Sequence, residues 1–224
     1  MDKILTDLQK NTLRFLAQSP LKDRFYWTGG TLLSVVYLQH RLSEDLDFFS
    51  DDKFGYQDVI GFINDLKTEI GLKDFDEKRI HDRWEFMLHN NDNLRVEFVF
   101  YDFPRLKPRE EWQGIFVDSL DDISANKVMA LFDRSHPKDL FDVFVLIKQE
   151  KYTIGQLLAN VQKKFGAKIS ESSLWSASEK ALKNLSTIRP FLLGENQQEK
   201  DKLVDEVKDF YISHSVSYLH SVLK

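Results

Sequence analysis

The order of two short segments between residues 29 and 49 constrains this chain more than any other feature of its sequence. The first is a Gly-Gly-Thr turn at residues 29–31, followed by an apolar run with helical character over residues 32–38. Glycines let the backbone approach a phosphate closely, and the N-terminus of a helix favours an anion. We therefore predict that residues 29–31 bind the phosphates of a nucleotide.

The second segment is Asp45-Leu46-Asp47, which opens a stretch with the composition of a strand. Side chains two residues apart on a strand project from the same face, so the two carboxylates are expected to lie side by side. Such a pair suits Mg²⁺ or Mn²⁺, because these cations prefer oxygen ligands and are often shared with substrate phosphates. Each segment alone is more often an ordinary turn or a solvated strand edge. Their order and spacing favour a nucleoside triphosphate with its metal.

The two segments belong to a longer block that is recognisable. Residues 29–33 read Gly-Gly-Thr-Leu-Leu, and residues 40–49 read His-Arg-Leu-Ser-Glu-Asp-Leu-Asp-Phe-Phe. This block resembles the AbiEii/AbiGii-type nucleotidyltransferases, a branch of the DNA polymerase β-like nucleotidyltransferase superfamily. The branch includes toxins of bacterial toxin–antitoxin and abortive-infection systems. The resemblance covers roughly residues 25–147, and it implies an α+β fold in which a mixed sheet flanked by helices is followed by a helical C-terminal part.

The composition restricts the class of protein. The chain has 224 residues, of which 42% are apolar, enough for one domain with an extension or for two small domains. It contains no cysteine, so disulfides, thiolate metal sites and cysteine nucleophiles are excluded. No run approaches the roughly 18 apolar residues that span a bilayer, and the first residues lack the apolar core of a signal peptide. We expect a cytoplasmic protein with no membrane contact.

Apolar periodicity and turn residues predict two domains. Together with the resemblance, they indicate a nucleotidyltransferase α/β core over residues 1–118 and a helical domain over residues 119–224 that completes the active site. In the core we expect helices over 2–18, 32–39 and 59–70, and strands over 24–28, 45–50, 73–80, 84–89, 94–101 and 112–117. In the helical domain we expect helices over 121–133, 137–149, 154–165, 171–184 and 201–223, a polar loop over 194–202, and Val128, Leu131 and Phe132 facing inward.

A third carboxylate, Glu97, is the candidate that would complete the site. Two-metal sites hold the attacking and leaving oxygens of an in-line displacement, and a further carboxylate bridges to the second metal or activates the attacking hydroxyl. Alternation along the predicted strand places Arg95 and Glu97 on one face. An acid among apolar residues needs a partner if it is buried. The alternative is that Glu97 faces solvent and simply pairs with Arg95.

A second block of charged residues lies on two predicted helices in the second domain. Lys127 and Arg134 are seven residues apart and share a side of one helix, and Asp139 and Asp142 share a side of the next. Taken alone, they would be charged outer faces linked by weak salt bridges. The resemblance implies instead that Lys127 contacts the triphosphate and that Asp142 orients Lys127 or accepts a proton. It implies that Asp139 pairs with Arg134.

The net charge of −5 argues against an electrostatic grip on nucleic acid over the whole surface. The charge is unevenly spread, however, because residues 43–77 hold 11 acidic and 3 basic residues, whereas residues 127–168 hold 8 basic and 4 acidic residues. The basic stretch suits an RNA acceptor contacted by lysines such as Lys163 and Lys164, although ordinary helix-surface charge is equally compatible. The resemblance suggests a tRNA end or a protein hydroxyl as the acceptor, with growth arrest as the outcome.

Together these features predict a magnesium-dependent nucleotidyltransferase of the EC 2.7.7 type, which moves a nucleotide from an NTP to an acceptor hydroxyl, that of a tRNA end. The predicted nucleotide-binding residues are Gly29, Gly30, Thr31 and Lys127. The predicted metal ligands are Asp45, Asp47 and Glu97, and the predicted catalytic residues are Asp45, Asp47, Glu97, Lys127 and Asp142. The resemblance also implies a cognate antitoxin as a partner. Transfer to a small molecule or a protein stays open, as does a non-catalytic interaction protein that retains the fold.

Overall fold

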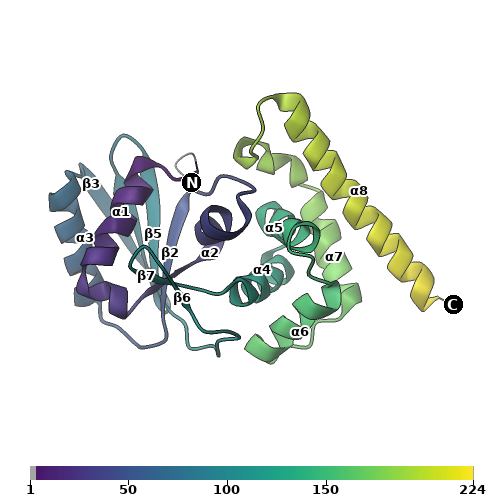
Figure 1. Ribbon diagram of the computed structural model, residues 1–224, viewed down its shortest axis with the longest axis horizontal. Helices are drawn as coiled ribbons and strands as arrows, with labels where there is room; N and C mark the ends of the chain where they lie inside the picture. Colours follow the sequence, from purple (N-terminus) through teal and green to yellow (C-terminus); the bar gives the residue numbers. More distant parts are fainter. Residues whose placement is uncertain (1–3, 224) are drawn as a thin grey trace. The chain divides into compact units, whose positions relative to one another are not determined.

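The computed structural model describes residues 4–223 and divides the chain into two compact units, Met1–Leu120 and Asp121–Lys224 (Figure 1). The first unit carries the sheet, and the second is built from helices. The predicted fold class, α+β with a helical C-terminal part, is confirmed. Of the helix expected over residues 2–18, residues 2 and 3 lie outside the described residues. The helix that the structure shows is α1 (Asp7–Gln18), which starts at a capping box formed by Thr6.

A seven-stranded sheet organises the first unit. Its strands are β1 (Tyr26–Thr28), β2 (Asp45–Ser50), β3 (Asp74–Ile80), β4 (Arg83–His89), β5 (Asn93–Phe100), β6 (Glu110–Trp112) and β7 (Ile115–Val117). They lie in the order β3-β4-β5-β2-β1-β7-β6. The β2–β5 and β1–β7 pairs are parallel and the other neighbours are antiparallel, so the sheet is mixed. The parallel β2–β5 pair lies at the centre and carries most of the candidate site.

One face of the sheet is apolar, and strand β2 shows this most clearly because its buried and partly exposed residues alternate. Leu46 and Phe48 of β2 are fully buried, whereas the residues between and beside them are partly exposed. Phe98 of β5 lies beside Phe48 and contacts Phe62 of helix α3 (Tyr56–Ile70), with ring centroids 5.7 Å apart. Full burial of a side chain of this size stabilises the fold by about 1.5–3 kcal/mol. The apolar face is therefore the core, and the opposite face carries the polar residues.

The link between β1 and β2 is helical from its first residue. Helix α2 (Gly29–Leu32) continues directly into a π-helical turn, η2 (Leu33–Leu38), which Gln39 ends in a left-handed conformation at φ 49°. The amide of Gln39 donates to the carbonyl of Ser34, 2.9 Å away. The helix therefore starts at the Gly-Gly turn itself, three residues before the predicted start, and its N-terminus lies at the carboxyl end of β1.

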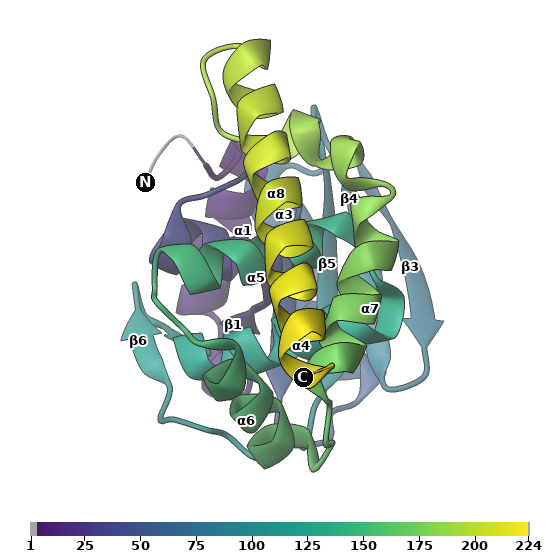
Figure 2. The same ribbon diagram turned by 90° about the vertical axis from the view of Figure 1, so that its right-hand side faces the viewer.

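The second unit is organised around α5 (Pro137–Lys148), whose residues from Pro137 to Leu146 are nearly all buried. The other elements are α4 (Leu120–Arg134), α6 (Ile154–Phe165), α7 (Glu171–Leu182), η3 (Leu185–Phe191) and α8 (Gln197–Val222). Figure 2 shows α8 running over α5 with α7 beside it. Phe210 of α8 contacts Phe144 of α5 with ring centroids 5.2 Å apart, and the Tyr211 hydroxyl donates to the carbonyl of Leu140 at 2.8 Å.

Two sequence expectations for this unit are wrong. The polar stretch 194–202 is not a loop throughout, because α8 begins at Gln197, where the Asn196 side chain accepts from the amide of Glu199 at 3.0 Å. Asparagine at the N-cap and glutamate in the first turn favour a helix start, and this signal outweighs the polarity. Phe132 does not face inward but is 41% exposed, because its neighbour Leu131 lies on the buried side of α4.

The segment expected to form one strand over residues 112–117 is instead a hairpin. β6 and β7 are joined by a tight turn at Gln113 and Gly114, both at positive φ.

Among residues 4–223, none of the helices combines the length and apolar character needed to cross a membrane.

Candidate active site

The polar face of the sheet brings the sequence-predicted carboxylates of the first unit into one row. Asp45 and Asp47 lie on the same face of β2, opposite to the buried Leu46. Asp47 is paired in register with Glu97 on β5, and Glu97 is paired with Glu85 on β4. Because residues directly opposite each other on neighbouring strands share a face, three carboxylates follow one another across three strands.

The Gly-Gly turn lies directly against the second aspartate of this row. Gly29 has φ +82°, and a Cβ added there would lie 1.8 Å from Oδ2 of Asp47. No other residue type can occupy this position without displacing the carboxylate or straining the backbone. On the other side of the turn, the hydroxyl of Thr31 donates to the backbone carbonyl of Asp45. Gly29, Thr31, Asp45 and Asp47 are therefore brought together, with Gly30 between the first two.

The start of helix α2 carries no side-chain cap. Thr28 holds the N-cap position, but its hydroxyl donates to a carboxylate oxygen of the buried Asp118 at 2.9 Å instead of accepting from the helix. Backbone amides at the first turn of a helix need partners from outside the helix, and anions commonly serve. The Thr28–Asp118 pair was not found from the sequence, because only the parallel β1–β7 pairing brings Asp118 beside β1.

Arg95 links the first aspartate to the rest of the row. Its guanidinium makes two hydrogen bonds to the Asp45 carboxylate, Nε to Oδ1 at 3.1 Å and a terminal nitrogen to Oδ2 at 2.6 Å. A second terminal nitrogen lies 3.0 Å from Glu97 and 3.6 Å from Glu85. The hydrogen bonds that Arg95 donates to Asp45 raise the pKa of Arg95 further above its usual value, so it stays charged. The sequence indicated only the Arg95–Glu97 contact.

Glu97 is buried, contrary to the alternative in which it faces solvent, yet it keeps the Arg95 contact which that alternative predicted. It also receives a hydrogen bond from Arg83 at 3.3 Å. Burial raises the pKa of Glu97 above its usual value, and the two arginines oppose this shift. A carboxyl with a raised pKa in a polar row is a reasonable proton acceptor.

The donor set of the row suits a metal that arrives with a nucleotide. Across residues 4–223, no three His, Asp or Glu side chains form a ready-made metal centre. Magnesium in nucleotide sites usually takes only one or two carboxylates and completes its shell with phosphate oxygens and water. Asp45 and Asp47, partly exposed and on one strand face, fit that smaller requirement. Glu97 lies next to Asp47 but is engaged by two guanidinium groups.

The helical block in the second unit forms a buried charge cluster. Nζ of Lys127 lies 2.8 Å from Asp142 and 3.3 Å from Asp139. Arg134 makes two hydrogen bonds to Asp139, at 2.7 and 3.0 Å. Lys127 and both aspartates are buried, so the block is not a set of charged outer faces. The predicted Arg134–Asp139 pair is confirmed, and Asp142 contacts Lys127 as the resemblance implied.

The basic stretch 127–168 is not a continuous exposed surface. Lys164 is only 3% exposed, and its Nζ lies 2.8 Å from the buried carboxylate of Asp122. The expectation that Lys164 contacts RNA is therefore wrong, because this lysine is an internal ion-pair partner. Lys138 lies over the ring of Phe191, 3.5 Å from its centroid. Lys163 remains exposed.

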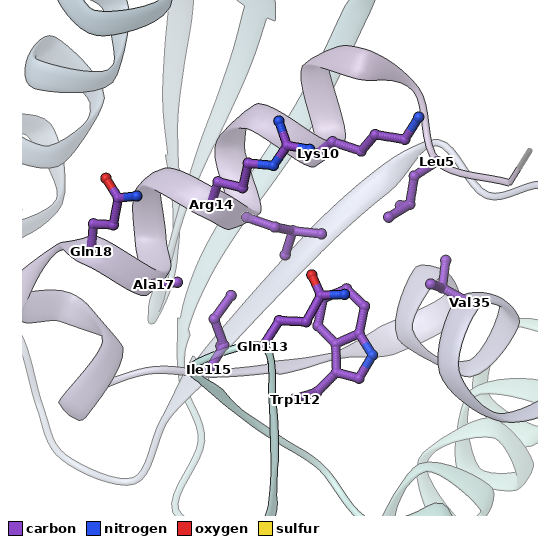
Figure 3. Close-up of a pocket in the computed structure, with 10 residues that line it drawn as sticks. Leu5, Lys10, Arg14, Ala17, Gln18, Val35, Trp112, Gln113 and Ile115 are labelled. Carbon is purple, nitrogen blue, oxygen red and sulfur yellow. The ribbon is translucent and has the colours of Figure 1, made fainter. Parts of the chain in front are cut away.

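A separate cavity of about 270 Å³ lies between α1 and the β6–β7 hairpin (Figure 3). Its walls are mostly apolar, including Leu13, Ile115 and Trp112, and Lys10 and Arg14 of α1 lie at its edge. None of the predicted site residues lines it. Nothing in this cavity resembles the carboxylate row.

Comparison with known proteins places this chain in the class of nucleotidyltransferases. The profile described as "Nucleotidyl transferase AbiEii toxin, Type IV TA system" matches residues 13–211. The chain belongs to this AbiEii toxin family of type IV toxin–antitoxin systems.

Three similar proteins can be named. The chain is 28% identical over 161 residues to the uncharacterized protein aq_aa25 of Aquifex aeolicus, covering 70% of this chain and 74% of that protein. The crystal structure of JHP933 from Helicobacter pylori is 20% identical with a TM-score of 0.59, over 97% of this chain and 95% of that one. A second H. pylori structure, for which nucleotidyltransferase activity is suggested, is 19% identical with a TM-score of 0.59, over 92% of this chain and 96% of that one. At such identities, the two structures support the fold alone.

The contact between Gly29 and Asp47 makes a first prediction. Gly29→Ala should lower transfer about 100-fold, because a shift of about 1 Å in a reacting group can cost that much. The left-handed φ should also cost about 1–2 kcal/mol of stability. Gly71→Ala is the matched control, since Gly71 has φ +64° and nothing within 4 Å of an added Cβ.

Nucleotide-transfer rates and thermal denaturation of both variants check this prediction. Gly71→Ala should lose stability only through its φ, whereas Gly29→Ala should lose at least as much stability, and only Gly29→Ala should lose activity. Equal activity in the two would show that the Asp47 contact has no part in the reaction.

Proposed function

We propose that this protein transfers a nucleotide from an NTP to a hydroxyl of an RNA acceptor, a tRNA end, with Mg²⁺ or Mn²⁺ bound at Asp45 and Asp47. The observation that carries the proposal is the placement of the Asp47 carboxylate against the backbone of Gly29, at the uncapped start of a helix. A phosphate-type turn and a metal-type carboxylate pair are thereby adjacent. Because the chain belongs to a nucleotidyltransferase family, we interpret the adjacent turn and carboxylates as a nucleotide and metal site.

The proposed reaction assigns roles to the turn at residues 29–31, to the metal and to Glu97. The amides of residues 29–31 bind the phosphates, with the positive end of the helix facing them. When bound, the metal supplies positive charge that offsets the charge on the phosphate oxygens. Glu97 accepts the proton of the acceptor hydroxyl, whose oxygen forms a bond to the α-phosphorus. The bond between the α-phosphorus and the bridging oxygen breaks, and pyrophosphate leaves.

Lys127, in the buried cluster of the second unit, is proposed to bind a phosphate group. Lys127 supplies a compact positive charge of the kind that suits phosphate. Asp142 and Asp139 fix its ammonium at 2.8 and 3.3 Å, so its position does not depend on solvent-exposed rotamers. Asp142 is thus a positioning residue for Lys127. Arg134 holds Asp139 from the other side.

The acceptor is proposed from the surface charge of the second unit and from family membership. Exposed lysines such as Lys163 remain in the basic stretch although Lys164 is buried, and they suit the phosphates of an RNA. Membership of a toxin family is consistent with a cellular RNA as the target, and it suggests a cognate antitoxin as a protein partner. A small-molecule or protein hydroxyl is the alternative acceptor, and the same carboxylate row would serve it.

Incubation with NTPs labelled at the α-phosphate tests the proposal. Total tRNA, a protein extract and a small-molecule extract are offered separately, with Mg²⁺ or with EDTA. We expect label in tRNA, only with Mg²⁺. Label confined to protein or to small molecules would replace the acceptor class, and no transfer to any of them would contradict the proposed activity.

Salt dependence gives a second prediction for the acceptor. Each lysine that binds an RNA phosphate should contribute about 0.7–0.9 to the slope of log affinity against log salt concentration. Reversing Lys163 and Lys168 to glutamate should therefore flatten that slope and weaken tRNA binding. Both lysines are exposed, so neither change disturbs the core. Reversal of Lys180 and Lys183, exposed on and after α7, is the charge-matched control. Equal effects of the two pairs would show that only net charge matters.

A further inference from the structure

Arg95 is hydrogen-bonded to the carboxylate of Asp45, which a metal would need as a ligand. Both oxygens of Asp45 accept hydrogen bonds from this guanidinium, at 3.1 and 2.6 Å. Paired, two-point contacts of this kind are the strongest that arginine makes with a carboxylate. Both side chains remain about one third exposed, so the pair is accessible to an incoming ligand. A divalent cation at Asp45 must therefore compete with Arg95.

Arg95 can leave Asp45 and still keep two of its partners. One of its terminal nitrogens already lies 3.0 Å from Glu97 and 3.6 Å from Glu85. Release of Asp45 would leave the guanidinium between these two carboxylates on the same face of β4 and β5. The exchange thus costs only the Asp45 contact, and it does not bury an unpaired charge.

We propose that Arg95 is a positioning residue that holds Asp45 until metal and nucleotide arrive together and displace it towards Glu97 and Glu85. The inference rests on the proposed function, because it takes Asp45 as a metal ligand. A divalent cation that binds without a nucleotide must offset the cost of displacing Arg95 through its own contacts only. A cation bound to a triphosphate has additional contacts with the helix start at residues 29–31, which favour the exchange. Arg95 therefore makes metal binding conditional on the nucleotide.

Manganese binding without nucleotide tests the inference directly. Free Mn²⁺ is measured by electron paramagnetic resonance in titrations of the wild type and Arg95→Gln. Removing the charged competitor should tighten binding about tenfold, since hydrogen bonds to charged groups are worth roughly that factor or more. Arg83→Gln is the control, because Arg83 contacts Glu97 from β4, which is separated from the strand of Asp45 by β5. It should change the affinity less than about twofold.

A double-mutant cycle separates competition at Asp45 from a general change in charge. In an Asp45→Asn background, Arg95→Gln should no longer tighten Mn²⁺ binding, because the contested carboxylate is gone. Circular dichroism of each variant confirms that the sheet is retained. An unchanged or weaker affinity in Arg95→Gln, or an equal gain in Arg83→Gln, would overturn the inference.

The same samples distinguish failure of the inference from failure of the proposed function. If the wild type transfers nucleotide only with divalent metal while Arg95→Gln binds Mn²⁺ no better, the inference alone fails. If transfer needs no divalent metal and none of the variants binds Mn²⁺ with or without a non-hydrolysable NTP, both fail. Tighter Mn²⁺ binding in Arg95→Gln that also loses its dependence on nucleotide supports both.

Discussion

Asp47→Asn should reduce nucleotide transfer by about 10²–10³-fold, which is the loss typical of removing one preorganised electrostatic group from an active site. Asparagine keeps the size of the side chain, so it can still lie against Gly29. Under the proposed function, it loses a negative charge that the metal requires and leaves only Asp45 as a full ligand on β2. The expected defect is therefore in turnover with little change in stability. Steady-state transfer rates and thermal denaturation of the variant measure both.

Asp52→Asn is the matched control for this change. Asp52 is an exposed aspartate just after β2, so the substitution removes the same charge close to the same strand. It should retain transfer within about twofold, because surface substitutions away from special contacts usually have small effects. Asp47→Asn with wild-type turnover would show that the carboxylate row is not the reaction site.

Lys164→Glu should destabilise the second unit by about 3–5 kcal/mol, because it places two carboxylates in a buried position built for one ion pair. Lys164 and Asp122 are both buried, and their charged atoms are 2.8 Å apart. The neighbouring Lys163 is exposed, so Lys163→Glu should change stability by no more than about 0.5 kcal/mol. Urea denaturation of the two single variants makes the comparison.

A replacement of the whole pair tests the reason for this effect. Asp122→Leu combined with Lys164→Met removes both charges, and such replacements are often neutral or stabilising. The double variant should therefore recover most of the stability that Lys164→Glu loses. Equal stability of Lys163→Glu and Lys164→Glu would show that the Lys164–Asp122 pair contributes nothing to the fold.

Local periodicity was sufficient for most of the elements. Strand β2 and helix α6 match their predicted ranges, because each combines a clear apolar pattern with marked ends. Thr153 and Gly166 mark those ends for α6, as an N-cap and a left-handed C-cap. The errors lie where a local signal competes with composition. The start of α8 is hidden by polar residues, and the β6–β7 hairpin is too short for a period to be counted.

The candidate site could be predicted only in part, since some of its contacts depend on strand pairing. The Gly-Gly turn and the two aspartates lie close in sequence, and their spacing was informative. The contact between Arg95 and Asp45 depends on the parallel register of β5 with β2, which places these two residues opposite each other. The pattern of apolar residues within each strand does not reveal how the two strands are aligned with each other. Glu85 joined the row for the same reason.

Burial of charge was the property that the sequence concealed most. Lys127 and Lys164 both lie in a stretch that reads as a basic surface, yet each is buried against aspartates of another helix. The family resemblance implied the pairing of Lys127 with Asp142, but nothing in the sequence indicated that Lys164 pairs with Asp122 before the helices are packed. The charge count of residues 127–168 therefore overstates the surface available to an acceptor.

Diffraction from crystals grown with Mn²⁺ and a non-hydrolysable NTP, recorded at the manganese absorption edge, shows whether the turn at residues 29–31 and the carboxylates of Asp45 and Asp47 form one metal and nucleotide site. The predicted result is an anomalous peak bound by both aspartates, with the phosphates against the amides of residues 29–31. Manganese and nucleotide bound together elsewhere, with Asp45 still held by Arg95, would contradict it.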